Sequence, residues 1–191
     1  MRAVVLDGAL SGDPAFRRIR CIVEGELSGL SWEMTQFLLD ECDIAPCTGC
    51  RSCWCATPGR CVIKDDAENI LRAIVKSDLL VFLTPVTFGG YSAILKNFVD
   101  RMPPLVSPFF MKKGDGFIHK GRYPRPPRMV GIGMLAAMDM ESVRVFSSIV
   151  GVNAAKMQAP AHASVVLSGR HGQGLLAENI RNALARVEVM R

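Results

Sequence analysis

Short apolar runs alternate with amphipathic segments along this chain. Residues 3–6 form a continuous apolar run with β-branched side chains, which is typical of a strand buried on both faces. Further strands are expected, in chain order, at residues 31–39, 79–83, 130–135 and 164–167. After each strand, apolar positions recur at helical spacing, in segments that begin near residues 13, 65, 91, 141 and 175. These alternations predict an α/β fold with a parallel sheet covered on both faces and right-handed crossovers.

Local signals mark where some of these elements begin and end. Asp13-Pro14 is typical of a helix start, with an N-cap carboxylate followed by proline in the first turn. Thr84-Pro85 is expected to end the third strand, because proline has no N–H to donate. Residues 103–128 are rich in proline and show poor periodicity, so we expect an irregular insertion there. The whole chain, residues 1–191, is then a single domain.

Composition limits the classes of protein that this chain can be. Apolar residues make up 49% of 191 residues, which is ample for a buried core. The first apolar run ends at Asp7, too early for a signal peptide, and the longest later run, residues 129–138, is far short of the ~20 residues that span a bilayer. We therefore expect a cytoplasmic protein with no membrane partner. The net charge of +5 mildly favours phosphorylated cofactors, and the absence of a nucleic-acid motif argues against a nucleic-acid partner.

The turn after the first strand is a candidate phosphate site. Gly8, Ser11 and Gly12 lie in a turn that runs into a helix N-terminus, where free backbone N–H groups and the helix dipole favour an anion. Asp13 argues against this, because an N-cap carboxylate competes for the same N–H groups and repels an anion. An ordinary strand-to-helix turn is the alternative.

The loop after the third strand is a candidate site for a flat heteroaromatic ring. Its apolar surface and backbone amides lie at the carboxyl edge of the expected sheet, and its glycines permit close backbone approach. A glycine-rich turn without a ligand is the alternative. The candidate residues are Pro85, Val86, Thr87, Phe88, Gly89 and Tyr91.

Five of the seven cysteines lie between residues 47 and 61. Cys47, Cys50 and Cys53 form a C-x2-C-x2-C pattern, and Cys61 follows after seven residues. Clustered cysteines in a cytosolic chain more often bind metal or do redox chemistry than form disulfides. Four thiolates at this spacing can bind an iron–sulfur cluster or a tetrahedral zinc, and a metal-free structural loop is the third alternative.

The remaining sulfur and imidazole side chains are expected to be structural. Cys21 and Cys42 are interpreted as buried apolar residues. The methionines at 134, 138 and 140 are interpreted as packing residues rather than as part of a cofactor site. His119 is a lone histidine in the expected insertion, for which a surface or hydrogen-bonded role is more common than catalysis.

Four stretches together resemble the NADPH-dependent FMN reductase family. They read IAPCTGCRSCW at 44–54, CVIKDD at 61–66, SDLLVFLTPVTFGGYSAILKNFVDR at 77–101 and PLVSPFF at 104–110. The cysteine spacing also resembles the iron–sulfur flavoprotein branch of that group. The turn at residues 8–13 departs from the family, in which this loop often reads Gly-Ser-Pro-Arg.

The resemblance implies a flavodoxin-like three-layer sandwich with a five-stranded parallel sheet in the order 2-1-3-4-5. It implies FMN at the carboxyl edge, with the phosphate on the first loop and the ring on residues 85–91. It further implies a homodimer or homotetramer in which a neighbouring subunit partly covers the ring, and residues 103–128 are the candidate contact.

The leading functional hypothesis is an FMN-dependent NAD(P)H oxidoreductase. Hydride would pass from nicotinamide to flavin, and electrons would continue to a small-molecule or protein acceptor. No catalytic acid or base is assigned, because the protein's task in such a step is to position and tune the ring. One alternative is an electron-transfer protein with FMN and a 4Fe-4S cluster on Cys47, Cys50, Cys53 and Cys61. A second is a non-redox interaction module that a zinc ion stabilises.

Overall fold

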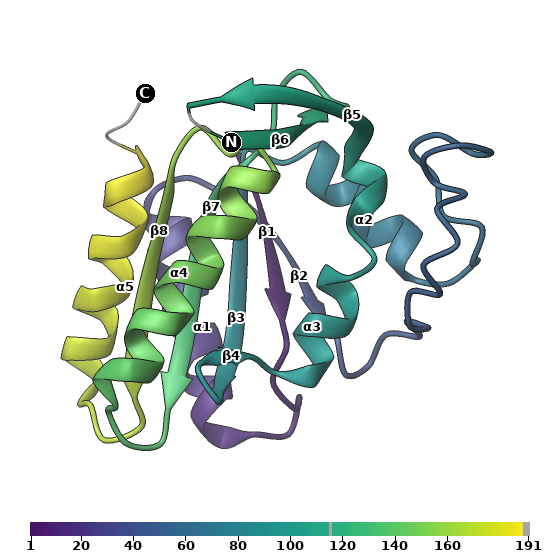
Figure 1. Ribbon diagram of the computed structural model, residues 1–191. Helices are drawn as coiled ribbons and strands as arrows, with labels where there is room; N and C mark the ends of the chain where they lie inside the picture. The colour runs from purple at the N-terminus through teal and green to yellow at the C-terminus, as the bar shows by residue number, and fades with distance from the viewer. Residues whose placement is uncertain (115, 189–191) are drawn as a thin grey trace.

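The computed structural model describes residues 1–114 and 116–188 and centres on a twisted parallel sheet (Figure 1). The strands run in the order β2-β1-β3-β7-β8, and each neighbouring pair is parallel, which confirms the expected order 2-1-3-4-5. Their bounds are β1 (Arg2–Asp7), β2 (Glu33–Leu38), β3 (Leu79–Thr87), β7 (Arg128–Leu135) and β8 (His162–Ser168). The short strand β4 (Gly90–Tyr91) pairs antiparallel with the end of β3.

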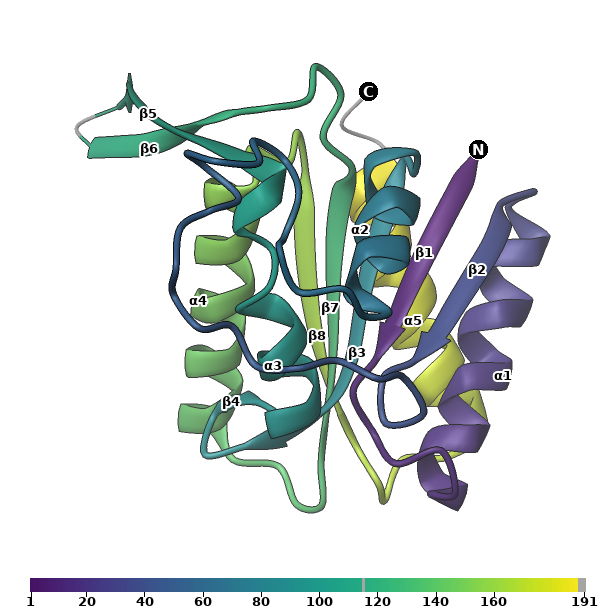
Figure 2. The same cartoon turned by 90° about the vertical axis from the view of Figure 1, so that its right-hand side faces the viewer.

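Helices cover both faces of this sheet, as Figure 2 shows from the side. Two core clusters result because alternate side chains of each strand point to opposite faces. Ala3 and Val5 pack with α1 and α5, whereas Val4 and Leu6 pack in the cluster formed with α2, α3 and α4. The helices are α1 (Pro14–Gly29), α2 (Ala67–Val75), α3 (Ala93–Val99), α4 (Met140–Lys156) and α5 (Gln173–Glu188). Within the described residues, no helix combines the length and hydropathy that crossing a bilayer requires.

Strand β3 continues past Pro85, contrary to the expectation that Thr84-Pro85 would end it. Its pairing with β1 ends at Leu83, whereas its pairing with β7 continues to Pro85, opposite Met134. The strand therefore has an open edge on the β1 side at this point, and a residue without an N–H is tolerated at such an edge.

The segment expected to be an irregular insertion contains regular structure. A 3-10 helix η1 (Pro103–Leu105) is followed by β5 (Val106–Lys113) and β6 (Gly116–Gly121), which form a two-stranded antiparallel ribbon. Pro108 lies where the register shifts between Val106 and Phe110, and a bulge of this kind accommodates proline. The ribbon lies at the end of the sheet opposite to β4 (Figures 1 and 2).

One helix boundary also differs from expectation. The third helix begins at Ala93 rather than near 91, because Ser92 is its N-cap and accepts a hydrogen bond from the Leu95 amide at 3.1 Å. The last helix is described to Glu188. Its expected end at residue 190 lies outside the described residues.

Candidate functional site

The carboxyl ends of β1, β3 and β7 meet at one edge of the sheet, the lower edge in Figure 1. Side chains between the first two loops fix their relative position. The Ser92 hydroxyl donates to the carbonyl of Gly8 at 2.6 Å, and the buried Thr84 hydroxyl accepts from the Ser92 amide at 3.0 Å. Gly8 must be glycine here, because an added Cβ would lie 2.5 Å from the Cβ of Leu95. The loops after β1 and β3 therefore form one connected structure.

Three backbone amides of the first loop are hydrogen-bonded within the protein. The Gly8 amide donates to the carbonyl of Leu83 at 2.8 Å. The Ala9 amide donates to the Asp7 carboxylate at 2.9 Å, and the Ser11 amide donates to the Asp40 carboxylate at 2.6 Å. The amides of Gly8 and Ser11 are therefore not free for a phosphate in this structure, and a phosphate contact of Gly12 or of the Ser11 hydroxyl stays a prediction.

The side chain of Arg20 in α1 stabilises the conformation of this loop. Its Nε donates to the buried Asp7 carboxylate, and its two terminal nitrogens donate to the carbonyls of Ser11 at 2.8 Å and Leu10 at 3.0 Å. Burial raises the pKa of Asp7, although Arg20 and the Ala9 amide act in the opposite direction. Arg20 is thus engaged by protein groups. Asp13 caps α1 as expected, accepting from the Ala15 amide at 2.8 Å.

The end of β3 and the turn that follows it expose only part of the surface that was expected to contact the ring. Phe88 is fully exposed, Thr87 is exposed, and Pro85 and Val86 are half-buried. Phe88 and Gly89 have φ values of 50° and 76° and make the tight turn into β4. An added Cβ at Gly89 would lie 2.9 Å from Val145 of α4, so this glycine serves packing against the helix and not ligand approach.

Tyr91, which was expected to contact the ring, is buried in the core. Its ring makes edge contacts with Phe82 and Phe146, with centroids 5.5 and 5.8 Å away. Its hydroxyl accepts a hydrogen bond from Asn153 at 2.9 Å, and burial raises the pKa of Tyr91 to about 12. Tyr91 therefore supports the loop from behind, and the surface available to a ligand is formed by residues 85–88.

An exposed apolar set at this edge was not expected. Met138 and Met140 were interpreted as packing residues, but both are exposed, whereas Met134 is half-buried against the core. Phe88 follows β3, Met138 and Met140 lie between the end of β7 and the start of α4, and exposed Leu10 follows β1, so all four are at this edge of the sheet. Exposed apolar side chains on adjacent loops suit the face of a flat ring. Their chain position after an apolar strand was the available signal.

The cysteine segment, residues 42–61, is hydrogen-bonded on both sides to residues in or next to α3. Asn97 donates to the carbonyl of Ile44 at 2.8 Å. Arg101, which is buried, donates to the carbonyl of Ala45 and makes a bidentate pair with Asp65 at 2.6 and 3.0 Å. Burial alone would raise the pKa of Asp65, but Arg101 and the amides of Ala45 and Ala67 lower it below its usual value.

Within the C-x2-C-x2-C-x7-C pattern, the other three cysteines act electrostatically on Cys53. Burial raises the pKa of the Cys53 thiol, and the charges of Cys61, Cys47 and Cys50 raise it further. Nevertheless, among the residues that the structure describes, no three His, Cys, Asp or Glu side chains are arranged to hold a metal ion. The thiols are thus neighbours without coordination geometry. Cys21 is exposed and Cys42 is half-buried, so the expectation that both are buried is wrong for Cys21.

Trp54 attaches the cysteine segment to the β5–β6 ribbon. Its indole N–H donates to the carbonyl of Pro103 at 2.9 Å, and its ring lies 4.8 Å from that of His119. His119 also stacks on Phe110, with centroids 4.4 Å apart, and its Nδ1 lies 2.9 Å from the carbonyl oxygen of Ser107. His119 therefore has the structural role that was expected of it.

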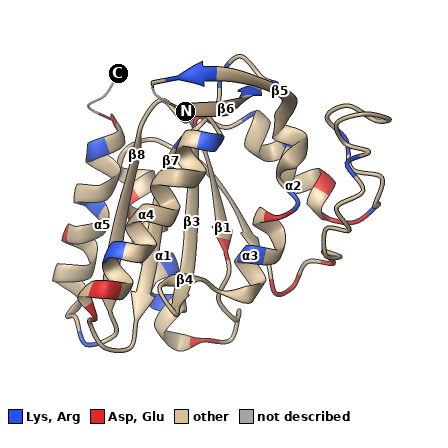
Figure 3. Ribbon diagram, viewed as in Figure 1, with Lys and Arg blue, Asp and Glu red and all other residues tan. Residues whose placement is uncertain are grey.

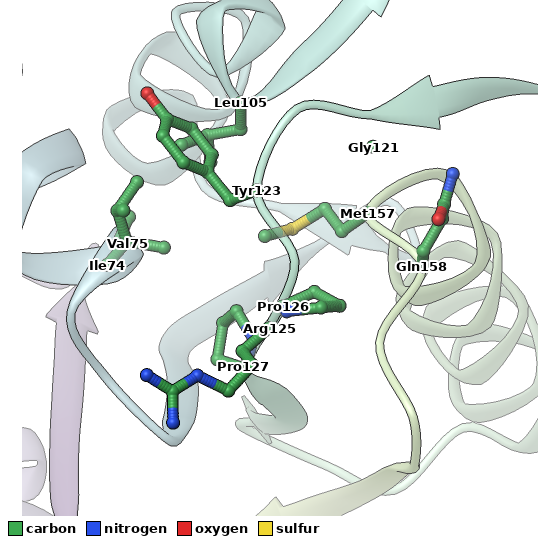
Figure 4. A pocket seen from close by; sticks show the side chains of 10 residues that line it. All are labelled: Ile74, Val75, Leu105, Gly121, Tyr123, Arg125, Pro126, Pro127, Met157 and Gln158. Carbon is green, nitrogen blue, oxygen red and sulfur yellow. The ribbon is translucent and has the colours of Figure 1, made fainter.

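One concave surface lies away from the carboxyl edge and another begins at it. The cavity in Figure 4 is lined by side chains of α2, of Leu105, of residues 121–127 and of Met157 and Gln158 after α4, and it measures about 30 Å³, which is room for about one or two water molecules. A larger groove of about 530 Å³ begins beside Tyr91 and continues between α3 and α4. The first is too small for a cofactor, and the second lies on a helical face of the molecule.

The comparison with known families decides how this edge is interpreted. The family model described as NADPH-dependent FMN reductase matches residues 1–122. The chain belongs to the NADPH-dependent FMN reductase family. Its resemblance to that family in sequence is therefore confirmed, as is its flavodoxin-like fold.

The relatives and solved structures that resemble this chain match different shares of its length. An iron-sulfur flavoprotein of Methanocaldococcus jannaschii is 40% identical over 72 residues, which are 37% of this chain and 36% of that protein. The chain spans between about a third and a half of the length of the curated relatives that it matches. Among solved structures, the NAD(P)H:quinone oxidoreductase from Methanothermobacter marburgensis has a TM-score of 0.75 at 14% identity and covers 98% of this chain and 97% of its own. An NADH:FMN oxidoreductase in its apo form has a TM-score of 0.66 at 11% identity, covering 98% and 88%.

Family membership implies a flavin, and this chain fits the two parts of FMN unequally. The exposed set of Leu10, Phe88, Met138 and Met140 suits the ring, and Thr84 and Ser92 hold the supporting loops in place. The first loop fits the phosphate poorly, because the amides of Ala9 and Ser11 are bound to carboxylates and Arg20 is bound to protein groups.

Proposed function

We propose that this chain is a flavin-dependent oxidoreductase of the flavin reductase type that takes electrons from NAD(P)H. The observation that carries the proposal is the exposed apolar edge around Phe88 in a member of this family. When bound there, a flavin can accept a hydride from a nicotinamide and deliver electrons to a small-molecule or protein acceptor. A cytoplasmic location is part of the same proposal.

The chain's own residues would position the ring. Phe88 would offer an apolar face, and the backbone of residues 85–88 would hydrogen-bond the ring's polar edge. The Thr84–Ser92–Gly8 hydrogen bonds would keep this surface rigid, so that the ring-binding surface does not have to be reorganised during each turnover. No side chain is needed as a general acid or base for this task.

The test is an anaerobic titration of the purified, FMN-mixed protein with NADPH and with NADH. We expect the visible flavin absorbance to bleach with one of the two at a rate well above that of free FMN. The variant Phe88→Ser should slow the bleaching, whereas Leu30→Ser, which changes an exposed apolar residue at the C-terminal end of α1, should not. Absorbance that stays unchanged with both nicotinamides would contradict the reductase proposal.

A second candidate is an electron-transfer protein with a 4Fe-4S cluster on Cys47, Cys50, Cys53 and Cys61. The observation in its favour is that the charges of Cys61, Cys47 and Cys50 act on the Cys53 thiol and raise its pKa, so the four thiols of the pattern interact electrostatically. Metal binding would require these thiols to move into coordination geometry, which loops of this kind do when metal binding and folding are coupled. Zinc in the same thiols would instead favour the structural module.

The same anaerobic sample distinguishes these alternatives by its iron, acid-labile sulfide and zinc content. If the cluster exists, Cys53→Ser should abolish its absorbance, whereas Cys55→Ser, a thiol of the same loop outside the pattern, should not. Iron at background level in the anaerobic protein would contradict the cluster, and stoichiometric zinc would favour the module.

A further inference from the structure

Asp40 is a carboxylate that the proposed function does not use. It follows β2 and reaches the loop after β1, where its Oδ2 accepts the Ser11 amide at 2.6 Å. Its Oδ1 is buried and has no hydrogen-bond partner among the described residues. A buried carboxylate oxygen without a partner is unfavourable for folding, so stability alone does not explain this side chain.

Asp40 belongs to a set of three carboxylates around the first loop. Asp7, Asp13 and Asp40 each accept a hydrogen bond from one backbone amide, those of Ala9, Ala15 and Ser11 respectively. The Asp7 and Asp40 charges are close enough for Asp40 to raise the pKa of Asp7. The Asp13 carboxylate caps the N-terminus of α1, where a phosphate would otherwise be favoured, and Asp40 occupies the Ser11 amide of the preceding loop.

The nearest cations do not neutralise the negative charge that these three carboxylates place around the first loop. Arg20 is committed to Asp7 and to the carbonyls of Leu10 and Ser11. Arg17 and Arg18 are exposed on α1, where water and salt screen their charge. A phosphate dianion that used the Ser11 amide would have to displace Asp40 from it and would remain beside the carboxylates of Asp7 and Asp13.

We propose that Asp40 is a specificity-determining residue that keeps phosphate out of the first loop, so that the chain selects a flavin by its ring. The ligand class is then a flavin with or without a phosphate, and riboflavin binds about as well as FMN. This inference rests on the proposed function, because it concerns the flavin that the same edge would take.

The first experiment titrates the full chain with riboflavin and, separately, with FMN, following flavin fluorescence. We expect the two dissociation constants to agree within about threefold, because Asp40 occupies the Ser11 amide and the carboxylates of Asp7, Asp13 and Asp40 repel the phosphate. FMN binding tighter than riboflavin by about tenfold or more, the gain from one charge-assisted hydrogen bond, would overturn the inference. If neither flavin binds, the proposed function itself fails and the inference falls with it.

The second experiment removes the carboxylate. In Asp40→Ala the Ser11 amide becomes free and one negative charge is lost, so FMN affinity should rise by about tenfold while riboflavin affinity stays the same. Asp40→Asn, which keeps an acceptor for Ser11 but loses the charge, should show a smaller rise in FMN affinity. Loss of the orphan oxygen should leave the thermal midpoint at or above that of the parent protein, so both variants should fold.

The matched control is Glu41→Ala, which removes the same charge from the adjacent exposed residue. It should leave the ratio of FMN to riboflavin affinity unchanged. An equal rise in FMN affinity in Glu41→Ala, or no rise in Asp40→Ala, would overturn the assignment to Asp40.

Discussion

The Asp65 carboxylate and the Arg101 guanidinium form an ion pair whose side chains are only 3% and 1% exposed. Removing one partner leaves the other charge buried and unpaired, which typically costs ~3–5 kcal/mol. We therefore expect Asp65→Asn to lower the free energy of unfolding by about 3 kcal/mol in urea denaturation. The control is Asp100→Asn, which breaks the exposed pair with Lys96 and should change stability by less than about 1 kcal/mol.

The same carboxylate predicts a pH dependence. Although burial opposes it, pairing with Arg101 lowers the pKa of Asp65 in the folded chain. Its contribution to stability is therefore fully present above the unfolded value of about 3.9 and is lost as the pH falls through the folded value. Between about pH 4 and pH 2 the parent protein should lose more stability than Asp65→Asn. Parallel stability curves for the two proteins would contradict this role.

Among the elements, the cysteine segment depends on its contact with η1 and the β5–β6 ribbon. Trp54→Phe keeps an aromatic ring beside His119 but removes the hydrogen bond to Pro103. We expect alkylation of the half-buried Cys53 and Cys61 to become several-fold faster, because the segment opens more often. Trp32→Phe is the matched control, since it loses an indole hydrogen bond to Glu188 elsewhere. Equal acceleration in both variants would indicate general destabilisation instead.

For the whole molecule, the expected homo-oligomer remains a proposal, and the ribbon is its candidate contact. Phe109, Phe110 and Phe117 are 65–73% exposed on β5 and β6, next to the basic residues that Figure 3 shows in blue on this ribbon. Exposed aromatic side chains gathered on one element are typical of interfaces. Sedimentation of the parent protein should give a dimer or tetramer, and Phe109→Ser with Phe117→Ser should shift it toward monomer. A parent protein that sediments as a monomer would contradict the proposal.

At this scale the sequence predicts the fold well, because the central strands β1 and β3 are apolar runs buried on both faces. The apolar runs at residues 3–6 and 79–83 lie at the centre of the observed sheet. The prediction is wrong where tertiary neighbours decide the outcome. Pro85 continues a strand only because β1 has already ended, and residues 106–121 form a ribbon despite their prolines.

The candidate site is predictable only in part, for a related reason. The spacing of the apolar runs places the first loop and residues 85–91 at one edge of the sheet, and the topology confirms that placement. The Asp40 contact joins residues 29 positions apart and has no signature in local sequence. Burial of Tyr91 likewise depends on Phe146, far along the chain.

The fastening of the cysteine segment to α3 has a thermodynamic consequence. Asn97 and Arg101 hold Ile44, Ala45 and Asp65, so the two ends of the segment are fixed whatever lies between them. The entropy of closing a loop grows only with the logarithm of its length. The segment between these anchors can therefore gain or lose residues, or bind a different metal, with little effect on the sheet. The central sheet and its helices are in this sense stable independently of the length and sequence of residues 46–64.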